Sequence, residues 1–212
     1  MTEFNYFWIF KEGLPKRICD DIIKYGDLKK EEERLGIIGD IGDRDITKKP
    51  LSKKELKKLY ELRKSNIVWM EDRWIYQEVH PFIHAANKQA GWNYQWDWSE
   101  TSQYTIYNKG GYYDWHCDSW PAPYKGEGQQ KGKIRKLSVT VCLSDASEFE
   151  GGDLEFDYRN VHPKKPKPII KASDLTKGSI VVFPSWVWHR VTPVTKGIRK
   201  SLVVWSCGWP FK

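Results

Sequence analysis

The chain has 212 residues, of which 40% are hydrophobic and 15% aromatic, with 12 tryptophans. This apolar content can form a sizeable core, so it excludes a fully disordered chain and fits one domain. No apolar run approaches the roughly 18 residues of a membrane span, and we predict no secretory signal. Four cysteines without a CxxC pair predict no disulfide framework, so we expect a reducing cytoplasm and no membrane partner.

The net charge of +7 lies entirely in the second half of the chain. Residues 101–212 carry 17 basic and 10 acidic side chains, whereas residues 1–100 carry 18 of each. A basic half could attract nucleic acid, a membrane surface or small acidic ligands. A solvated surface with lysine-rich loops explains the same charge, and composition alone favours it.

The first hundred residues are predicted to be mainly helical. We expect a helix at 52–64, because its first residue and Glu55 form a capping box. Residues 66–71 fit a short strand, and residues 74–90 fit a longer helix that is interrupted at Pro81. An earlier helix is marked by four apolar residues at helical spacing, namely Leu14, Ile18, Ile22 and Tyr25.

From Trp92 onward, short alternating runs separated by Gly, Pro, Asn and Asp predict strands. In the clearest run, 137–143, the odd-numbered residues are Leu or Val, so they face one side. Many short strands at this spacing favour a jelly-roll barrel. We predict an α+β fold in one domain, with residues 1–98 as mainly helical support and residues 99–212 as the jelly-roll core. The expected strands are 102–107, 137–143, 154–158, 179–183 and 201–206.

Three residues of the second half have the chemistry of a metal site. His116 and Asp118 form an H-x-D triplet, which on a strand would place both side chains on one face. His189 follows the next clear strand and could supply a third ligand. Two histidines and one carboxylate, with open positions opposite, suit a non-haem Fe(II) ion that activates O₂. Cys117, between the first two, should then point away into the core.

Arg199 lies ten residues after His189, on the next predicted strand. Strand alternation should place it on the face opposite Lys200. A buried arginine is costly unless it meets an anion, and its planar guanidinium matches a carboxylate. We therefore predict that Arg199 points inward and binds an acidic ligand.

Three segments resemble the 2-oxoglutarate/Fe(II)-dependent oxygenases of the prolyl 4-hydroxylase type, and most of all the bacterial PKHD-type hydroxylases. Residues 107–118, with the sequence YNKGGYYDWHCD, are similar to the first metal-binding segment of that family. Residues 143–154 are similar to its strand-turn segment. Residues 178–199 are similar to its second metal segment, and the likeness extends over about residues 100–206.

The resemblance implies a double-stranded β-helix that binds Fe(II) through His116, Asp118 and His189. It implies that Arg199 pairs with the distal carboxylate of 2-oxoglutarate and that the Tyr107 hydroxyl bonds the same group. It further implies hydroxylation of a peptidyl residue, for which we expect proline, with O₂ consumed, succinate and CO₂ released, and ascorbate as a candidate accessory reductant. The resemblance assigns the substrate groove to Tyr113, Arg135 and Trp205.

Other interpretations remain open at this point. Cys142 stands where several relatives have tyrosine, which leaves the substrate uncertain, so a nucleic acid or a small molecule is an alternative substrate. Nucleic-acid enzymes of this type carry a further arginine after the first, and here none follows Arg199, so we do not expect nucleic acid as a partner. A non-catalytic jelly-roll binding module is a third interpretation. Residues 121–133 are either a mobile loop or a substrate lid.

His80 and His84 share a helix face and form a rival metal pair. A zinc protease would need glutamate directly after the first histidine, and this chain has Pro81 there. We therefore interpret the two histidines as ordinary surface residues of a helix.

Overall fold

The computed structural model describes residues 4–29, 32–36, 50–119, 122–125, 127–157, 169–170 and 174–211. Its helices are α1 (Lys16–Leu28), α2 (Lys53–Leu62), α3 (Arg73–Gln89) and the 3₁₀ helix η3 (Ala146–Glu148). Its strands are β1 (Trp8–Phe10), β2 (Arg34–Leu35), β3 (Arg63–Lys64), β4 (Asn66–Met70), β5 (Trp98–Ser99), β6 (Ser102–Tyr107), β7 (Tyr112–His116), β8 (Ile134–Cys142), β9 (Phe149–Gly151), β10 (Leu154–Asp157), β11 (Ile169–Ile170), β12 (Ile180–Pro184), β13 (Trp188–Val191), β14 (Val194–Gly197) and β15 (Arg199–Gly208).

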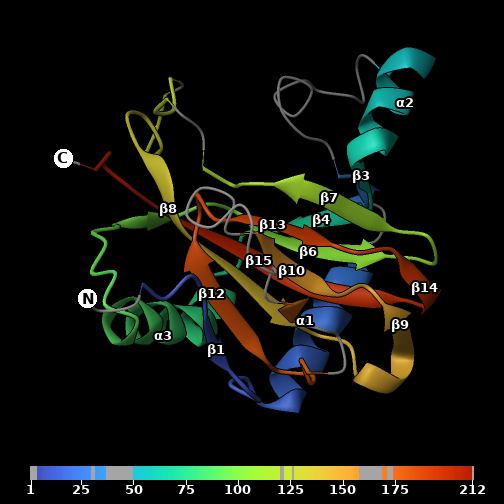
Figure 1. Ribbon diagram of the computed structural model, residues 1–212, viewed down its shortest axis with the longest axis horizontal. Coiled ribbons are helices and arrows are strands. Elements are labelled where there is room, and N and C mark those ends of the chain that lie inside the picture. The colour runs from blue at the N-terminus through green and yellow to red at the C-terminus, as the bar shows by residue number, and fades with distance from the viewer. Residues whose placement is uncertain are drawn as a thin grey trace.

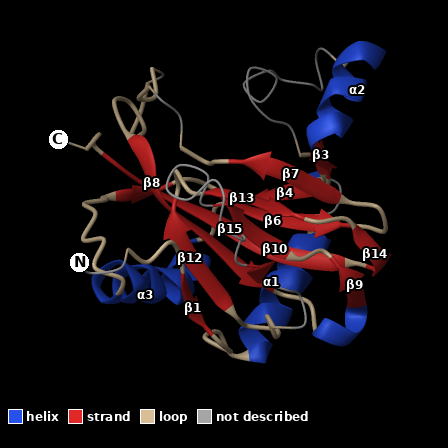
Figure 2. Cartoon of the chain, in the orientation of Figure 1, coloured by secondary structure: helices blue, strands red, loops and turns tan. Residues whose placement is uncertain are grey.

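Two antiparallel sheets form the body of the molecule (Figures 1 and 2). The larger has eight strands in the order β1-β12-β8-β15-β6-β4-β2, with β5 also paired to β15. The smaller has five strands in the order β11-β10-β13-β7-β3, and β14 pairs with β9 in a separate ribbon. The ribbon views place α1 and α3 together along one side of the larger sheet, whereas α2 projects away from the body. This is the jelly-roll, or double-stranded β-helix, fold predicted from the alternating runs.

Alternation along the central strands produces two separate apolar cores. In β8, Val139 and Val141 join the core formed with α1 and α3, whereas Cys142 belongs to the core between the sheets. In β12, Val182 faces the helices and Val181 faces the smaller sheet. A strand buried on both faces needs apolar residues at nearly every position, which explains the continuous apolar run in β12.

The N-terminal half contains the three predicted helices and also supplies strands to both sheets. The capping box that starts α2 is formed, since the Ser52 hydroxyl accepts a hydrogen bond from the Glu55 amide. The predicted interruption at Pro81 is wrong, because α3 continues through it from Arg73 to Gln89. Val79, Ile83 and other apolar residues of α3 are fully buried, and this packing offsets the hydrogen bond that Pro81 cannot donate.

Strands from the first 98 residues extend both sheets. β1 pairs with β12 and β4 pairs with β6 in the larger sheet, while β3 pairs with β7 in the smaller one. Residues 1–98, which were predicted to be mainly helical support, therefore also contribute strands to the barrel. No helix in the described ranges has the length and apolarity needed to cross a membrane.

Candidate active site

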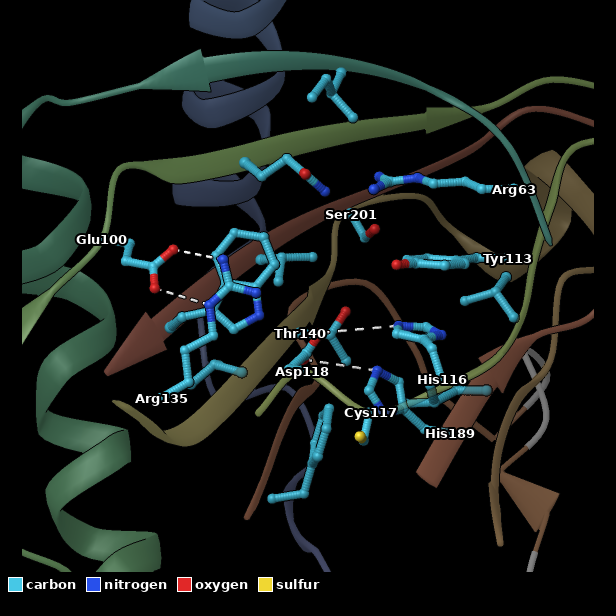
Figure 3. A pocket seen from close by; sticks show the side chains of 18 of the residues that line it. Arg63, Glu100, Tyr113, His116, Cys117, Asp118, Arg135, Thr140, His189 and Ser201 are labelled. Carbon is cyan, nitrogen blue, oxygen red and sulfur yellow. Dashed lines mark hydrogen bonds and ion pairs between the residues drawn. The ribbon is translucent and has the colours of Figure 1, made fainter. Parts of the chain in front are cut away.

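A cavity of about 680 Å³ lies between the two sheets and contains the predicted site residues. Strands β6, β8 and β15 of the larger sheet and β3, β7 and β13 of the smaller sheet contribute side chains to its wall. Figure 3 shows how these side chains converge. All eight residues predicted from the sequence as metal, cofactor or substrate contacts line it, namely Tyr107, Tyr113, His116, Asp118, Arg135, His189, Arg199 and Trp205.

His116, Asp118 and His189 come together at one point of this cavity (Figure 3). Their nearest ligand atoms all lie within 4.8 Å of one another. The Nε2 atoms of His116 and His189 lie 3.8 and 3.7 Å from the two Asp118 carboxylate oxygens. The register explains this convergence, because His189 on β13 is directly paired with His116 on β7. These distances leave room for a metal ion between the three groups.

The backbone and two serines hold the three side chains in place. His116 Nδ1 donates to the Asp114 carbonyl at 2.7 Å and His189 Nδ1 donates to the Val187 carbonyl at 3.0 Å, so both Nε2 lone pairs are left for a metal. The Ser138 hydroxyl donates to the Asp118 carboxylate at 2.7 Å and lies 2.9 Å from the Ser185 hydroxyl. Asp118 lies two residues beyond β7, where its amide donates to the Ser185 carbonyl at 2.8 Å.

Burial and neighbouring charges shift the pKa values of His116 and Asp118 in the directions that suit metal binding. Burial, followed by the charge of His189, lowers the pKa of His116 to about 3, so its imidazole is neutral at pH 7. Burial acts to raise the pKa of Asp118, but His189, His116 and Arg135 outweigh it and lower the pKa to about 2. The neutral His116 imidazole and the Asp118 carboxylate therefore lie beside His189, and two imidazoles with one carboxylate are the donor set that suits Fe(II) in oxygenases.

Arg199 is 3% exposed and reaches the same cavity from β15, as predicted. Its guanidinium donates to the Ser201 hydroxyl at 3.3 Å and lies 5.4 Å from the centre of the Tyr107 ring. No described carboxylate forms an ion pair with it. Lys200 points the other way and pairs with Asp27 at 2.9 Å, which confirms the expected alternation.

Tyr113 stacks directly on a candidate metal ligand. Its ring is nearly parallel to the His116 imidazole, with ring centres 3.5 Å apart and an interplanar angle of 10°. On its other side, the Arg63 guanidinium carbon lies 4.6 Å from the ring centre. Burial raises the pKa of Tyr113 far above its usual range, so its hydroxyl stays protonated. Arg63 was not predicted as a site residue, because it lies inside the expected helix at 52–64 and nothing local marks it.

Arg135 lies in the cavity wall and is already paired with a carboxylate. Its Nε and Nη2 donate to the two Glu100 oxygens at 2.8 and 2.5 Å, and its guanidinium carbon lies 4.0 Å from the centre of the Trp205 ring. Tyr124 also donates to Glu100 at 2.8 Å. Burial acts to raise the pKa of Glu100, but Arg135 and these hydrogen bonds outweigh it and lower the pKa. Sequence reasoning missed Glu100, because nothing local marks it as the partner of Arg135.

Two further expectations can be compared with the structure. The core placement of Cys117 is wrong, because its side chain is partly exposed and lines the cavity (Figure 3). The chain has left β7 at this point, so strand alternation no longer directs the side chain outward.

His80 and His84 lie on α3, as expected, where His84 stacks on Trp96 with ring centres 4.6 Å apart. Within the described chain, the three-ligand group of potential metal-binding residues is the one around His116.

Comparison with known proteins agrees with this geometry. The family model described as the 2OG-Fe(II) oxygenase superfamily matches residues 102–207, which contain all three candidate ligands. The chain belongs to the 2OG-Fe(II) oxygenase superfamily. Members of this superfamily use Fe(II) as the metal cofactor and 2-oxoglutarate and O₂ as cosubstrates. It also confirms the family to which the sequence motifs were assigned.

Relatives of this oxygenase include bacterial PKHD-type hydroxylases. One from Acidovorax ebreus is 35% identical over 104 residues, which cover 49% of this chain and 41% of the relative. One from Synechococcus sp. is 39% identical over 98 residues, which cover 46% of this chain and 37% of the relative. The matched region thus spans about two fifths of the length of these relatives.

Solved structures share the fold over nearly the whole chain. A viral collagen prolyl hydroxylase from Paramecium bursaria Chlorella virus-1 superposes with a TM-score of 0.62 at 17% identity, covering 96% of this chain and 97% of the viral one. A prolyl-4-hydroxylase from Pseudomonas putida gives the same TM-score and identity, covering 95% and 91%. A Trichoplax adhaerens prolyl hydroxylase, solved with a hypoxia inducible factor peptide, has a TM-score of 0.61 at 15% identity, covering 95% and 83%. These likenesses establish the double-stranded β-helix fold.

Proposed function

We propose that the chain is a 2-oxoglutarate- and Fe(II)-dependent dioxygenase that hydroxylates a peptidyl residue, with proline as the expected target. The single observation that carries the proposal is the convergence of His116, Asp118 and His189 in a cavity that also contains the buried guanidinium of Arg199, which no described carboxylate pairs with. The co-products would be succinate and CO₂. The prolyl hydroxylase structures, one of them solved with a hypoxia inducible factor peptide, support the peptide assignment, and the PKHD-type relatives support hydroxylation.

His116, Asp118 and His189 would hold Fe(II), which when bound supplies the redox chemistry that couples O₂ and 2-oxoglutarate to C–H hydroxylation. The chain's own contribution is positioning. The backbone carbonyls of Asp114 and Val187 fix the imidazole tautomers, and Ser138 fixes one carboxylate oxygen. These contacts orient the ligands before the metal arrives and limit how far they can move.

Arg199 would bind the distal carboxylate of 2-oxoglutarate. A buried guanidinium without an acidic partner gains most from a bidentate anion, and the low-dielectric wall strengthens that pairing. Tyr107 lies on β6 directly opposite Arg199 in the register, so its hydroxyl can join the same carboxylate. The two residues together would hold the cosubstrate in one orientation.

The groove for the peptide would be formed by Tyr113, Arg135 and Trp205, whose side chains line the cavity. The loop at 121–133 is described at 122–125 and 127–133, and it reaches the cavity wall through Tyr124 and Gln130. We retain the proposal that it acts as a lid, which excludes bulk water while substrate is bound. Limited proteolysis should show protection of this loop when a substrate peptide is added, and unchanged cleavage would contradict a lid.

The cytoplasm is our proposed compartment. All four cysteines are free thiols, and Cys19, Cys142 and Cys207 are buried. Burial raises the pKa of Cys19 to about 11, so this thiol is unreactive at neutral pH. A reducing compartment would keep the partly exposed Cys117 in the same free state.

The decisive experiment incubates the purified protein with Fe(II), ascorbate, 2-oxoglutarate and libraries of peptides containing Pro, Lys or Asn. We expect succinate formation and a gain of one oxygen atom on a Pro-containing peptide by mass spectrometry. Both signals should disappear in His116→Ala. Succinate that never forms, with any peptide, would refute the dioxygenase assignment, and oxygen gained on Lys or Asn would correct the target residue.

A further inference from the structure

The cavity wall carries more positive than negative side chains. Among the residues described, its charged members are four arginines and two carboxylates: Arg34, Arg63, Arg135, Arg199, Glu100 and Asp118. Glu100 neutralises Arg135 through two hydrogen bonds, and Asp118 belongs to the metal cluster. Two buried guanidiniums, Arg63 and Arg199, are left without a described acidic partner.

Arg63 is 4% exposed and holds an unsatisfied donor. Its Nε donates to the Ser65 hydroxyl at 2.7 Å, but its Nη2 is buried without a hydrogen-bond partner in the described structure. Gly36 packs so closely against it that an added Cβ would lie 2.4 Å from Nε, so the guanidinium is confined from that side. A buried donor left unpaired is costly, and a buried charge is costlier still. The contacts that Arg63 makes with described residues do not offset this energetic cost.

Arg63, Tyr113 and His116 form a stack that leads from this guanidinium to the metal cluster. Figure 3 shows the three groups one above another on one side of the cavity. The guanidinium carbon lies 4.6 Å from the Tyr113 ring centre, which lies 3.5 Å from the centre of the His116 imidazole. The guanidinium is therefore no farther from the candidate metal ligand than these two separations combined.

We propose that Arg63 is a specificity-determining residue that binds a carboxylate of the peptide substrate. The inference rests on the proposed function and deepens it by assigning a substrate class. Fe(II), Asp118, Arg199 and a 2-oxoglutarate dianion together carry no net charge, so the cosubstrate leaves Arg63 uncompensated. An acidic substrate supplies the missing negative charge, whereas a neutral one leaves the guanidinium buried and unpaired.

The stack also limits where the carboxylate lies in the substrate. An extended peptide advances about 3.3 Å per residue, so the separation between Arg63 and His116 corresponds to about two or three residues, and we place the anion within about three positions of the residue that reacts. Two sources provide this chemistry, namely an Asp or Glu side chain and the carboxylate at the end of the chain. Both would accept hydrogen bonds from N–H groups along the edge of the planar guanidinium, whose face lies over the Tyr113 ring.

A peptide panel tests the proposal and separates these sources. Each peptide has one central proline and a single Glu or Gln at one position within three residues on either side, and a second set ends in a free carboxylate or an amide. Binding is measured by fluorescence anisotropy to the protein loaded with Mn(II) and 2-oxoglutarate, and hydroxylation is measured as kcat/KM. We expect at least one position where the carboxylate peptide is favoured tenfold to a hundredfold, the range of a charge-assisted hydrogen bond.

Three variants show whether Arg63 is responsible. Arg63→Gln should reduce the preference to about one, and Arg63→Lys, which keeps the charge and a compatible size, should retain part of it. Arg34→Gln is the matched control, since it removes an exposed arginine of the same cavity wall and should leave the preference in place. Circular dichroism checks that each variant is folded.

Several results would overturn the assignment. The first is a wild-type protein that binds carboxylate and amide peptides equally at every position. The second is a carboxylate preference that survives Arg63→Gln, or that Arg34→Gln reduces as much. The third is a KM for 2-oxoglutarate that rises in Arg63→Gln while the carboxylate preference is unchanged. The two proposals fail separately. Equal hydroxylation of Glu and Gln peptides refutes the role of Arg63 alone, whereas carboxylate-dependent binding without hydroxylation refutes the dioxygenase activity alone.

Discussion

The ion pair between Glu100 and Arg135 should be among the most sensitive sites for stability. The two side chains are 15% and 16% exposed, and two hydrogen bonds of 2.8 and 2.5 Å join them. In Glu100→Gln, one carboxylate oxygen becomes an NH₂ group, which then faces a donor of Arg135 or Tyr124. Removing one partner of a buried pair costs about 3–5 kcal/mol, because the other charge stays buried and uncompensated.

For a domain of this size, such a loss corresponds to a fall in Tm of about 6–20 °C. The measurement is urea denaturation of the metal-free protein, repeated for Glu100→Gln, Arg135→Met and the double variant. We expect the double variant to be more stable than the sum of the single losses predicts, by about 2 kcal/mol or more, because it leaves no charge unpaired. The exposed pair of Glu150 and Lys196 is the control, since Glu150→Gln should not shift the urea midpoint measurably.

Either of two results would show that Glu100 and Arg135 do not form a stabilising buried pair. One is a Glu100→Gln protein within about 1 kcal/mol of the wild type, which is the range of an exposed pair. The other is additivity of the two single losses within about 0.5 kcal/mol, which is expected of residues that do not interact. Either outcome would mean that water or a rearranged loop satisfies Arg135, which would then be free to contact a substrate.

Three further predictions follow from single residues. Gly197 has a φ of +71°, and a Cβ there would lie 1.9 Å from the Glu148 carbonyl oxygen. Gly197→Ala should therefore lose about 2 kcal/mol or more of unfolding free energy, measured by urea denaturation. An unchanged unfolding free energy would contradict this backbone constraint. Trp205 buries its Nε1 without a described hydrogen-bond partner. Trp205→Phe, which keeps a large ring, should change the unfolding free energy by about 1 kcal/mol or less, whereas Trp205→Ala should lose about 3–5 kcal/mol. Equal losses in the two variants would mean that the indole N–H, rather than the packing of the ring, stabilises the fold. The folded-state pKa of His116 lies near 3, below the unfolded value of 6.5, so unfolding takes up a proton. The unfolding free energy of the metal-free protein should therefore fall by up to about 1.4 kcal/mol per pH unit between pH 6 and 4.5. His116→Asn should reduce that slope, and an unchanged slope would assign it to other groups.

The convergence of His116, Asp118 and His189 could be predicted because the pattern is largely local. His116 and Asp118 are two residues apart, and the apolar strand before His189 marked where the third side chain would emerge. The inward direction of Arg199 followed from period-two alternation along one strand. The fold class could be predicted in the same way. In strands such as β8, apolar residues alternate with small polar ones, which is typical of a sheet whose two faces have different surroundings.

The remaining features depend on contacts between distant segments, which a single sequence does not contain. Arg63 enters the cavity only because β3 pairs with β7, and Glu100 meets Arg135 only because β5 and β8 both pair with β15. The helix α3 continues through Pro81 because its buried face outweighs the local preference of proline. Cys117 faces the cavity because β7 ends one residue earlier, a boundary that alternation alone does not mark.

The pairing of β1 with β12 and of β4 with β6 has a practical consequence for dissecting this protein. An excised fragment of residues 102–207 would contain every candidate ligand, yet it would expose the backbone N–H and C=O groups of β12 and β6 along two open edges. Open edges recruit strands from other molecules, so such a fragment is expected to aggregate. The minimal catalytic unit is therefore larger than the region that carries the sequence signature.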